Sequence, residues 1–447
     1  MQPVVPLSRP WDAIVVGTGP GGATVARALA RAGMRVLVLE QGSAAPLEGT
    51  LKQMAGMGAI PGKGAFLHRD ASLLVQGVTA GGSSALNFAT ASAPPIDMFA
   101  RHGIDLSDAL ASLRAELPIA PLPDRLIGPM ATRIGDAARA AGLDWHKLDK
   151  MIRPQTCRAG CWRCVYGCPY GAKWSARDFL DQAIEHGAQL LDHAKALRVV
   201  VNQGRASGVE YVRDGSTAFA RAPIVVLAGG GVGSPRLLHA SSLGARRSPF
   251  FSDPVIAVMG TVDDIDGGAE VPMAAGVRFD ADGISLADLT LPGPMYQAFA
   301  AQAGRLDRLL AHRRTLSIMV KIRDQIGGAV GPHWVSKPLH PSDRIKLAAG
   351  VAMARDVLQH AGASHIFASH HFAAHPGGSV RIGAGVDSKL QAGAAGLYVC
   401  DASVIPEAWG LPPTLTLLCL GVRLGAYLTQ GCAVPIPVAD SETRTPI

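Results

Sequence analysis

The sequence has no hydrophobic run long enough to cross a membrane. Its most apolar stretch, residues 414–428, is interrupted by Arg423 and is shorter than the roughly 20 residues that a bilayer core requires. Residues 1–10 contain neither the hydrophobic core of a secretory signal nor a twin-arginine pair. We therefore expect a cytoplasmic protein without a transmembrane segment, while export together with a signal-bearing partner would leave no trace in this sequence.

The excess of positive over negative charge is also small for a chain of this length. The formal net charge is +7 in 447 residues, and the basic residues are scattered along the chain. Nucleic-acid-binding proteins usually gather Lys and Arg into one patch or stripe, so nucleic acid is not an expected partner. Internal repeats and low-complexity tracts are absent as well, which argues against a solenoid or a propeller.

Cysteine is rare, yet four of the seven cysteines fall within twelve residues. They form the run Cys157-x3-Cys161-x2-Cys164-x3-Cys168, followed directly by Pro169. Four thiolates at such short spacings can wrap one iron-sulfur cluster, and we favour these four cysteines as metal ligands for that reason. Structural zinc sites usually separate two CxxC pairs by a longer stretch, and a chain of this length can bury a core without disulfides. Zinc, and a disulfide pair or free thiols, are the alternatives.

A dinucleotide-binding fingerprint lies near the start of the chain. An apolar strand runs into Gly17, a helix of small residues follows, and a second apolar strand ends on Glu40. Gly17 permits the turn, Gly19 lets the backbone approach a pyrophosphate, and Gly22 lets the helix and strand pack closely. The helix N-terminus then faces the phosphates. Glu40 can accept hydrogen bonds from ribose hydroxyls, which argues against NADP.

Three further segments carry a resemblance to a known family. Residues 77–87, residues 228–244 and the block from His375 to Thr416 are similar to signatures of the glucose-methanol-choline (GMC) oxidoreductases. This resemblance implies FAD as the cofactor. It also implies an α/β fold, with a Rossmann-like FAD-binding domain assembled from discontinuous segments and a small α+β substrate domain.

The placement of the motifs predicts how the chain is divided. We expect residues 1–95, 186–250 and 371–447 to form the FAD-binding domain, residues 96–185 to cover the flavin and carry the cysteine run, and residues 251–370 to form the substrate domain. The residues expected to bind FAD are Gly17, Gly19, Gly22, Glu40, Gly81, Gly82, Ser83, Asn87, Gly229, Asp401, Ala402, Pro413 and Thr414.

The resemblance also implies the catalytic residues. His375 aligns with the catalytic histidine of the family, and an imidazole can accept a hydroxyl proton near neutral pH. The family usually has a second catalytic Asn or His immediately before the proline that aligns with Pro413, where this chain has Pro412. Proline has neither a side-chain donor or acceptor nor an N–H, so this partner is lost. His371 and His370 are candidates to replace it.

The motifs together predict an FAD- and iron-sulfur-dependent alcohol dehydrogenase. Hydride from a CH–OH carbon would pass to FAD, and electrons would leave one at a time through a [4Fe-4S] or [3Fe-4S] cluster to an acceptor protein. A cluster favours a dehydrogenase over an oxidase, and the cysteine run resembles that of the cluster-bearing sugar and gluconate dehydrogenases of the family.

The sequence also bears on the class of small-molecule substrate, and it leaves two alternative functions open. Only 5% of the residues are aromatic, so a hydrophobic or small alcohol is expected rather than a carbohydrate. One alternative function is a reductase that receives electrons through the cluster and reduces a carbonyl or an activated double bond. Another is an electron-transfer subunit with a degenerate catalytic site.

Overall fold

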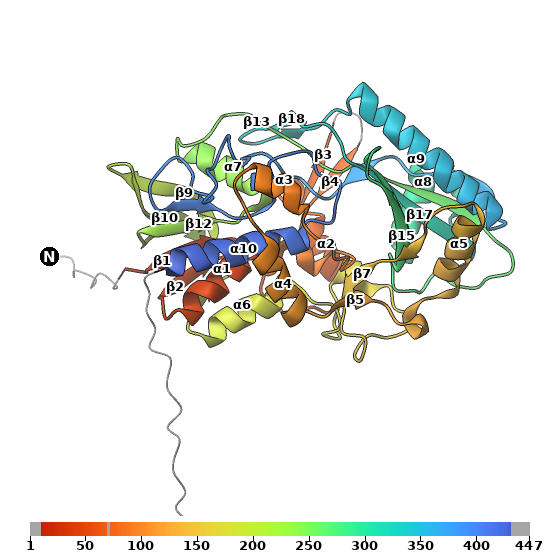
Figure 1. Cartoon of the computed structure of the whole chain (residues 1–447), viewed down its shortest axis with the longest axis horizontal. Coiled ribbons are helices and arrows are strands. Elements are labelled where there is room, and N and C mark those ends of the chain that lie inside the picture. The colour runs from red at the N-terminus through yellow and green to blue at the C-terminus, as the bar shows by residue number, and fades with distance from the viewer. Residues whose placement is uncertain (1–9, 69–71, 431–447) are drawn as a thin grey trace, which may run out of the picture.

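The computed structural model describes residues 10–68 and 72–430. The expectations about residues 1–9 and about residues 431–447, the end of the predicted FAD-binding domain, lie outside this part. Figure 1 shows an elongated molecule with a helix-covered sheet at one end and a second, larger sheet at the other. The boundaries between the predicted parts of the chain stay a prediction.

The sheet at the first end has five parallel strands in the order β22-β12-β1-β2-β8. β1 and β2 are buried along their whole length, as expected for parallel strands with both faces covered. The strands come from distant parts of the sequence, which is the discontinuous Rossmann-like arrangement predicted above. Their bounds are β1 (Ala13–Val16), β2 (Val36–Leu39), β8 (Gln189–Leu191), β12 (Ile224–Leu227) and β22 (Leu397–Val399).

Helices α1, α6 and α10 pack together beside this sheet (Figure 1). An antiparallel three-stranded sheet, β9 to β11, contacts β12 through β10, and α7 packs on β9. The bounds of these elements are α1 (Pro20–Arg31), α6 (Ala176–Glu185), α7 (Gly230–Ala240), α10 (Thr414–Thr429), β9 (Lys195–Asn202), β10 (Arg205–Arg213) and β11 (Ser216–Arg221).

Helices α1 and α10 run in the same direction. A Cβ on Gly421 would lie 2.6 Å from Cβ of Thr24, and a Cβ on Gly425 would lie 2.5 Å from Cβ of Ala28. Both helices therefore advance together, and glycine is required where they approach this closely. As a result, the N-termini of α1 and α10 point toward the same end of the sheet.

The second sheet has the order β3-β4-β21-β14-β17-β16-β15-β6, with β20 also paired to β14. Side chains of a strand alternate between the two faces. On β17, Ile318 and Val320 pack in the core beneath α5 and α9, whereas Met319 belongs to a different core cluster on the opposite face. By the same alternation Lys321 lies on the Met319 face.

Several strands of the second sheet come from outside residues 251–370. The strands of this sheet are β3 (Ala65–Leu67), β4 (Leu73–Val75), β6 (His146–Lys147), β14 (Val255–Thr261), β15 (Ala275–Phe279), β16 (Ile284–Asp288), β17 (Thr315–Ile322), β20 (Ser364–Ala368) and β21 (Phe372–Ala373). Helices α5 (Pro129–Ala140) and α9 (Pro341–His360) pack beside it.

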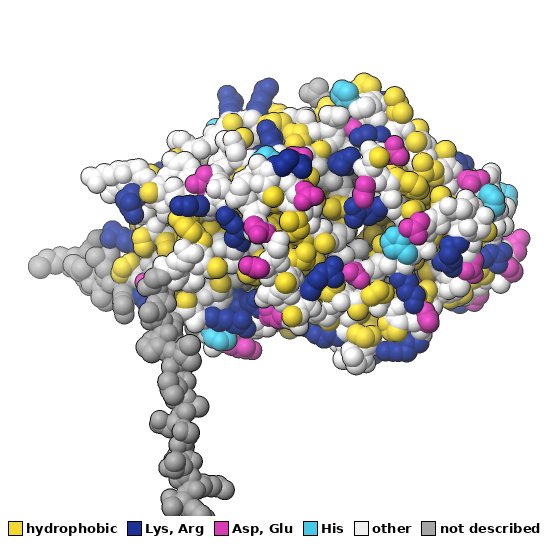
Figure 2. Space-filling model, viewed as in Figure 1, with side chains coloured by type: hydrophobic (Ala, Val, Ile, Leu, Met, Phe, Trp, Pro, Cys, Tyr) yellow, Lys and Arg dark blue, Asp and Glu magenta, His cyan; other side chains and the backbone are white. Residues whose placement is uncertain are grey.

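The remaining α-helices and strands are short. They are α2 (Leu51–Gly58), α3 (Ile96–Arg101), α4 (Ser107–Glu116), α8 (Gly293–Gln302), β5 (Ile119–Pro121), β7 (Asp149–Met151), β13 (Ser248–Phe250), β18 (Gly327–Val330) and β19 (Val335–Ser336). Among them, β13, β18 and β19 form a three-stranded sheet, and β5 pairs with β7. Within the described ranges, no helix is both long and apolar enough to span a bilayer. On the face drawn in Figure 2, acidic and basic side chains are interspersed.

Candidate active site and cofactor-binding segments

The turn between β1 and α1 is shaped by its glycines. Gly17 has a φ of +99°, and a Cβ there would lie 2.4 Å from the carbonyl oxygen of Ala228. A Cβ on Gly22 would lie 2.2 Å from the Gly17 carbonyl oxygen, so Gly22 permits the close packing of α1. By contrast, a Cβ on Gly19 would meet no atom within 4 Å. The open space at Gly19, in front of the N-terminus of α1, is where the fingerprint predicts the pyrophosphate.

A second glycine turn, far away in sequence, lies against the first one. A Cβ on Gly82 would be 3.1 Å from Cα of Gly19, and Gly81 adopts a φ of +84°. Ser83 follows in the same turn, where its Oγ accepts a hydrogen bond from Gly77 N at 2.9 Å. The structure therefore brings two predicted phosphate-binding turns together at the N-terminus of α1.

Glu40 is buried at the end of β2. Its Oε2 accepts hydrogen bonds from Thr18 Oγ1 at 2.6 Å and Thr18 N at 3.1 Å, and its Oε1 accepts one from Gly42 N at 2.8 Å. Burial raises the pKa of Glu40, and these hydrogen bonds oppose the increase. Thr18 Oγ1 in turn accepts a hydrogen bond from Gly81 N at 3.0 Å. Thr18, which the sequence analysis did not single out, thus connects Glu40 to the second glycine turn.

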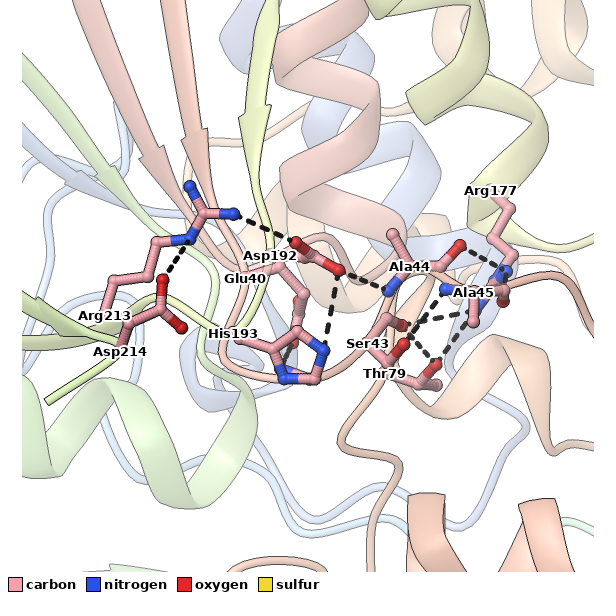
Figure 3. Close-up of polar contacts among 11 residues, drawn as sticks. Glu40, Ser43, Ala44, Ala45, Thr79, Arg177, Asp192, His193, Arg213 and Asp214 are labelled. Atoms are coloured by element: carbon pink, nitrogen blue, oxygen red, sulfur yellow. Dashed lines mark hydrogen bonds and ion pairs between the residues drawn. The ribbon is translucent and has the colours of Figure 1, made fainter.

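The loop after Glu40 is held by two charged side chains (Figure 3). Arg177 donates from Nη1 to Ala45 O at 2.7 Å and from Nη2 to Thr79 Oγ1 at 3.0 Å. Asp192 accepts a hydrogen bond from Ala44 N at 3.1 Å. Neither residue belongs to a recognisable motif, since each acts on backbone that is more than a hundred positions away.

Two other pairs of predicted cofactor-binding segments also meet. The Asp401 carboxylate accepts hydrogen bonds from Gly230 N at 2.9 Å and Ser403 N at 2.8 Å, so it joins the start of α7, next to Gly229, to the turn that contains Ala402. Asn87 Nδ2 donates to Thr414 Oγ1 at 3.2 Å, directly after Pro413 at the N-terminus of α10. That these residues bind FAD stays a prediction.

His375 is paired with an aspartate that the sequence analysis missed. His375 Nδ1 lies 3.2 Å from Oδ2 of Asp253, whose side chain is fully buried. Burial lowers the pKa of His375, and the interaction with Asp253 opposes this decrease. The other oxygen, Oδ1, accepts a hydrogen bond from Gly410 N at 2.8 Å, so Asp253 also holds the loop that leads into α10.

Asp253 is itself held rigidly. Its φ is +51°, a left-handed conformation that Asp tolerates better than most residues but that still costs energy. Asp324 Oδ1 accepts hydrogen bonds from Ser252 N and Asp253 N at 3.0 Å each. Asp324 also forms a buried ion pair with Lys337 at 3.0 Å. This network fixes the direction in which the Asp253 carboxylate points.

The two histidines considered as replacements for the residue lost at Pro412 differ in exposure. The side chain of His370 is exposed, and His371 is partly buried just before β21. Exposure argues against His370, because a group that handles a substrate proton needs a site shielded from water. His371 stays a prediction.

The four clustered cysteines line one small cavity. Its wall also contains Arg158, Tyr170 and Lys173. Burial raises the pKa of Cys157 to about 11, with further increases from the neighbouring thiols. Within the described residues, no group of three or more His, Cys, Asp or Glu could hold a metal ion. The thiols therefore surround a common space without forming a tetrahedral site for a single ion, and the predicted iron-sulfur cluster is not shown.

Two buried lysines lie beside these thiols. Lys173 Nζ donates to the carbonyl oxygens of Ala85, Asn87 and Cys164 at 2.8–3.0 Å. Lys150 Nζ donates to three other carbonyl oxygens, those of Phe88, Pro272 and Met273. Burial lowers the pKa of each lysine to about 8.

These lysines have a common electrostatic feature. Among the described residues, neither ammonium has a carboxylate within ion-pair distance, and the thiols of the cavity act on both charges. Lys173 also connects the Cys164 loop to the segment that ends at Asn87. The cavity is therefore flanked by positive charge and joined to a predicted flavin-binding segment.

Residues 11–258 match the N-terminal model of the GMC oxidoreductases, and residues 320–421 match the C-terminal model. The chain belongs to the GMC oxidoreductase family. The two matched ranges include the glycine turn at Gly17 as well as Asp253 and His375.

Curated members of the GMC family align with most of this chain. An uncharacterized GMC-type oxidoreductase of Mycobacterium tuberculosis is 29% identical, with 92% of this chain and 75% of that protein covered. A long-chain-alcohol oxidase of Arabidopsis thaliana is 24% identical, with 94% of this chain and 68% of that protein covered.

Solved structures share the GMC fold of this chain. Pyridoxine 4-oxidase from Mesorbium loti gives a TM-score of 0.72 at 16% identity, covering 94% of this chain and 99% of that one. A variant formate oxidase of Aspergillus oryzae gives 0.74 at 16% identity, covering 95% and 99%. At this identity the likeness establishes the fold alone, which confirms the predicted α/β architecture with a Rossmann-like FAD-binding domain.

Proposed function

We propose that this GMC oxidoreductase oxidises the CH–OH group of an apolar alcohol with FAD as the hydride acceptor. The observation that carries the proposal is the pairing of His375 Nδ1 with the buried carboxylate of Asp253. This pairing leaves Nε2 of the imidazole free to accept the hydroxyl proton. Asp253 contacts His375 and acts as a positioning residue.

The residues of the two glycine turns fit the diphosphate of FAD. The space at Gly19 is open, and the N-terminus of α1 supplies N–H groups and partial positive charge there. Glu40 retains acceptor capacity for a ribose hydroxyl beyond its three hydrogen bonds. When bound, FAD accepts the hydride that leaves the substrate carbon. The chain's own residues bind the cofactor, orient the alcohol and take its proton.

The lowered pKa of His375 suits a general base. A base must be unprotonated to accept a proton, and burial, which lowers the pKa of this imidazole, favours its neutral form. Asp253 opposes the decrease, so the imidazole can still be protonated when it takes the substrate proton. In the reverse direction the same imidazolium would return the proton, which keeps carbonyl reduction as the second candidate.

An apolar substrate is supported by the residues on the Met319 face of the second sheet. Phe88 and Phe372 are partly buried there, and Phe372 stacks on Phe299 at a ring-centroid distance of 5.3 Å. Phe88 directly follows Asn87, and Phe372 is three positions before His375. Apolar side chains thus lie next to both the predicted flavin-binding segment and the base, as a hydrophobic alcohol requires. The Arabidopsis relative is named as a long-chain-alcohol oxidase.

We further propose that Cys157, Cys161, Cys164 and Cys168 hold an iron-sulfur cluster that supplies one-electron transfer to an acceptor protein. The four thiols share one cavity, as a cluster requires and an unconnected set of thiols does not. A cluster with four thiolates is an anionic group, and the ammonium groups of Lys150 and Lys173 would stabilise it. The connection from Cys164 to Asn87 through Lys173 favours exchange with the flavin, and hence a dehydrogenase over an oxidase.

Cofactor analysis and anaerobic reduction test this proposal. Protein purified without oxygen should hold about one FAD and three or four irons per chain, without stoichiometric zinc. Apolar alcohols such as 1-octanol should bleach the flavin anaerobically, and turnover should be faster with an artificial one-electron dye than with oxygen. Zinc in place of iron would contradict the cluster. Bleaching by a reduced low-potential donor and by no alcohol would favour the reductase, and the absence of any turnover would favour an electron-transfer subunit.

A further inference from the structure

Lys321 differs from every other buried lysine of the described chain. The side chains of Lys150, Lys173, Lys321 and Lys337 are all at least 95% buried. Lys150, Lys173 and Lys337 donate hydrogen bonds to carbonyl oxygens, and Lys337 also pairs with Asp324. In the described residues, the ammonium of Lys321 donates no hydrogen bond and has no carboxylate within 4.0 Å, although the Asp253 carboxylate acts on its charge from farther away. The Nζ atom of Lys321 is not among the fully enclosed polar atoms that lack a partner, so it borders accessible space at the end of a buried side chain. Holding a charge there without a partner in the chain is costly, which points to a partner from outside the chain.

The position of Lys321 relates it to the base. On the second sheet, Lys321 pairs with Val255 of β14 and with Ser285 of β16. Asp253 precedes Val255 by two positions, and Lys321 lies close enough to Asp253 and His375 for its charge to act on both. Lys321 therefore stands beside the Asp253–His375 pair, on the sheet face that carries the apolar residues proposed to contact the substrate.

The loop that lacks the second catalytic side chain lies at the same place. Gly410 N donates to Asp253, and Gly410 and Leu411 share a small polar pocket with Ser285, the strand neighbour of Lys321. Pro412 follows directly in that loop. The side chain missing at Pro412 and the unpartnered ammonium of Lys321 thus belong to one neighbourhood, although they are 91 positions apart in sequence (412 minus 321).

We propose that Lys321 is a catalytic residue that binds the substrate oxygen, in place of the polar side chain missing at Pro412. The proposal rests on the alcohol oxidation proposed above. In that reaction the hydroxyl proton moves to Nε2 of His375, a hydride leaves the carbon for FAD with two electrons, and the C=O bond forms. Negative charge develops on the oxygen as its proton departs, and a preorganised ammonium in a water-poor site stabilises such charge strongly. The substrate oxygen would be the partner that Lys321 lacks within the chain.

Binding of octanoate, a carboxylate that mimics the charge of an octanol alkoxide, tests this assignment without turnover. The Lys321→Met protein should bind octanoate at least tenfold more weakly than the parent, as followed by flavin absorbance, whereas Lys321→Arg should stay within about threefold. In 1-octanol oxidation, Lys321→Met should lower kcat by about 10²- to 10³-fold, the usual effect of losing one oxyanion-stabilising donor, with a much smaller change in KM.

Thermal unfolding separates this catalytic function from a structural one. Lys321→Met removes an unpartnered buried charge, so its Tm should equal or exceed that of the parent, with FAD retained. The matched control Lys150→Met should lower Tm, because it leaves three buried carbonyl groups without their donor.

Three results would overturn the assignment. They are parent-like octanoate binding by Lys321→Met, no octanoate binding by the parent, and a Tm loss of Lys321→Met that matches the control. If the parent oxidises no alcohol, the proposed function fails, and the octanoate comparison still decides whether Lys321 binds an oxyanion.

Discussion

At the residue scale, the two nitrogens of His375 have different surroundings. Nδ1 lies next to Asp253, whose side chain is fully buried. The Asp253 carboxylate accepts a hydrogen bond from Gly410 N, and its backbone N donates to Asp324 Oδ1. A carboxylate partner on Nδ1 selects the tautomer whose Nε2 carries a free lone pair. The direction of the aspartate thus decides which nitrogen would accept the proton in the proposed reaction.

Replacing His375 with Ala should separate catalysis from cofactor binding. The variant should retain FAD, because the proposed FAD contacts lie in the glycine turns, but its turnover should fall by about 10²- to 10⁴-fold, the usual contribution of general acid–base catalysis. Stopped-flow measurement of anaerobic flavin reduction provides the test. A rate within threefold of the parent would assign the proton to another group, with His371 as the next candidate.

The pH dependence of turnover should reveal the Asp253–His375 pair. Because burial lowers the pKa of His375 from the ordinary value of 6.5, kcat/KM should stay high at neutral pH and fall only on the acid side of 6.5, where the imidazole becomes protonated. Asp253→Asn removes the group that raises this pKa, so the acid limb should move to still lower pH. A hydrogen bond to a charged group contributes about 1.5–3 kcal/mol, so kcat should drop by roughly ten- to hundredfold.

Asp253→Glu is the matched control for this prediction, because it keeps the charge and changes the geometry. It should keep the acid limb closer to the parent position than Asp253→Asn does. A pH profile that is identical in all three proteins would show that Asp253 does not act on the base. Linkage gives the same sign for stability, since a histidine with a lowered folded-state pKa loses its stabilising contribution as the pH falls below 6.5.

At the element scale, the β1–α1 turn owes its shape to glycines with two different tasks. Gly17 and Gly22 face backbone atoms of the protein itself, so a side chain there would push the strand and the helix apart. Gly19 faces open space and has a φ of −61°, which any residue adopts. Gly17 and Gly22 are therefore required by the fold, whereas the fold leaves space at Gly19, where we propose that the pyrophosphate binds.

Two single-methyl substitutions should reveal this division. Gly19→Ala should leave the Tm of the FAD-free protein near that of the parent but weaken FAD binding, since its methyl group occupies the space assigned to the pyrophosphate. Gly22→Ala should lower both, because a Cβ there would lie 2.2 Å from the carbonyl oxygen of Gly17. Thermal scans of the FAD-free proteins and fluorescence titration with FAD are the measurements. Unchanged FAD affinity in Gly19→Ala would contradict the assignment of this turn.

At the scale of the whole molecule, the cysteine cavity and the start of α10 lie on segments that meet near Asn87. Lys173 joins Cys164 to Asn87, and Asn87 contacts Thr414 at the start of α10. The proposed electron exchange between flavin and cysteines would use these linked segments. In the proposed function, proton and hydride removal would occur beside His375, and single electrons would leave at the cysteines.

Cys161→Ser should separate these two activities. Cys161 is only partly buried, so the variant should fold and retain FAD, and an alcohol should still bleach its flavin in a single anaerobic turnover. Multiple turnover with a one-electron protein acceptor should fall sharply, because the proposed cluster would lose a ligand. Cys419→Ala, which removes a buried thiol of α10 outside the cavity, should keep the turnover of the parent. Equal turnover of both variants with that acceptor would show that electrons bypass the cysteine run.

The sequence by itself determined the short motifs of this protein, such as the glycine turn after β1. Gly17, Gly22 and Glu40 could be recognised because a βαβ turn needs glycines and an acidic residue at fixed spacings, and His375 was predicted as the base from the residues that follow it. Each of these features depends on residue types at fixed spacings along the chain, so it can be recognised from the sequence without the structure. The family resemblance then predicted the fold, which the family and structure comparisons confirm.

Only the tertiary structure decided which distant residues contact the residues of each motif. Asp253 is 122 positions from His375 and belongs to no motif that spacing could reveal. Thr18 lies within the fingerprint, but at a variable position, so its bonds to Glu40 and Gly81 become visible only in the folded chain. Lys321 lies in an apolar strand, where the sequence cannot distinguish an ammonium with a partner from one without. Such pairings depend on strand register and on the direction of buried side chains, and these properties exist only after the chain has folded.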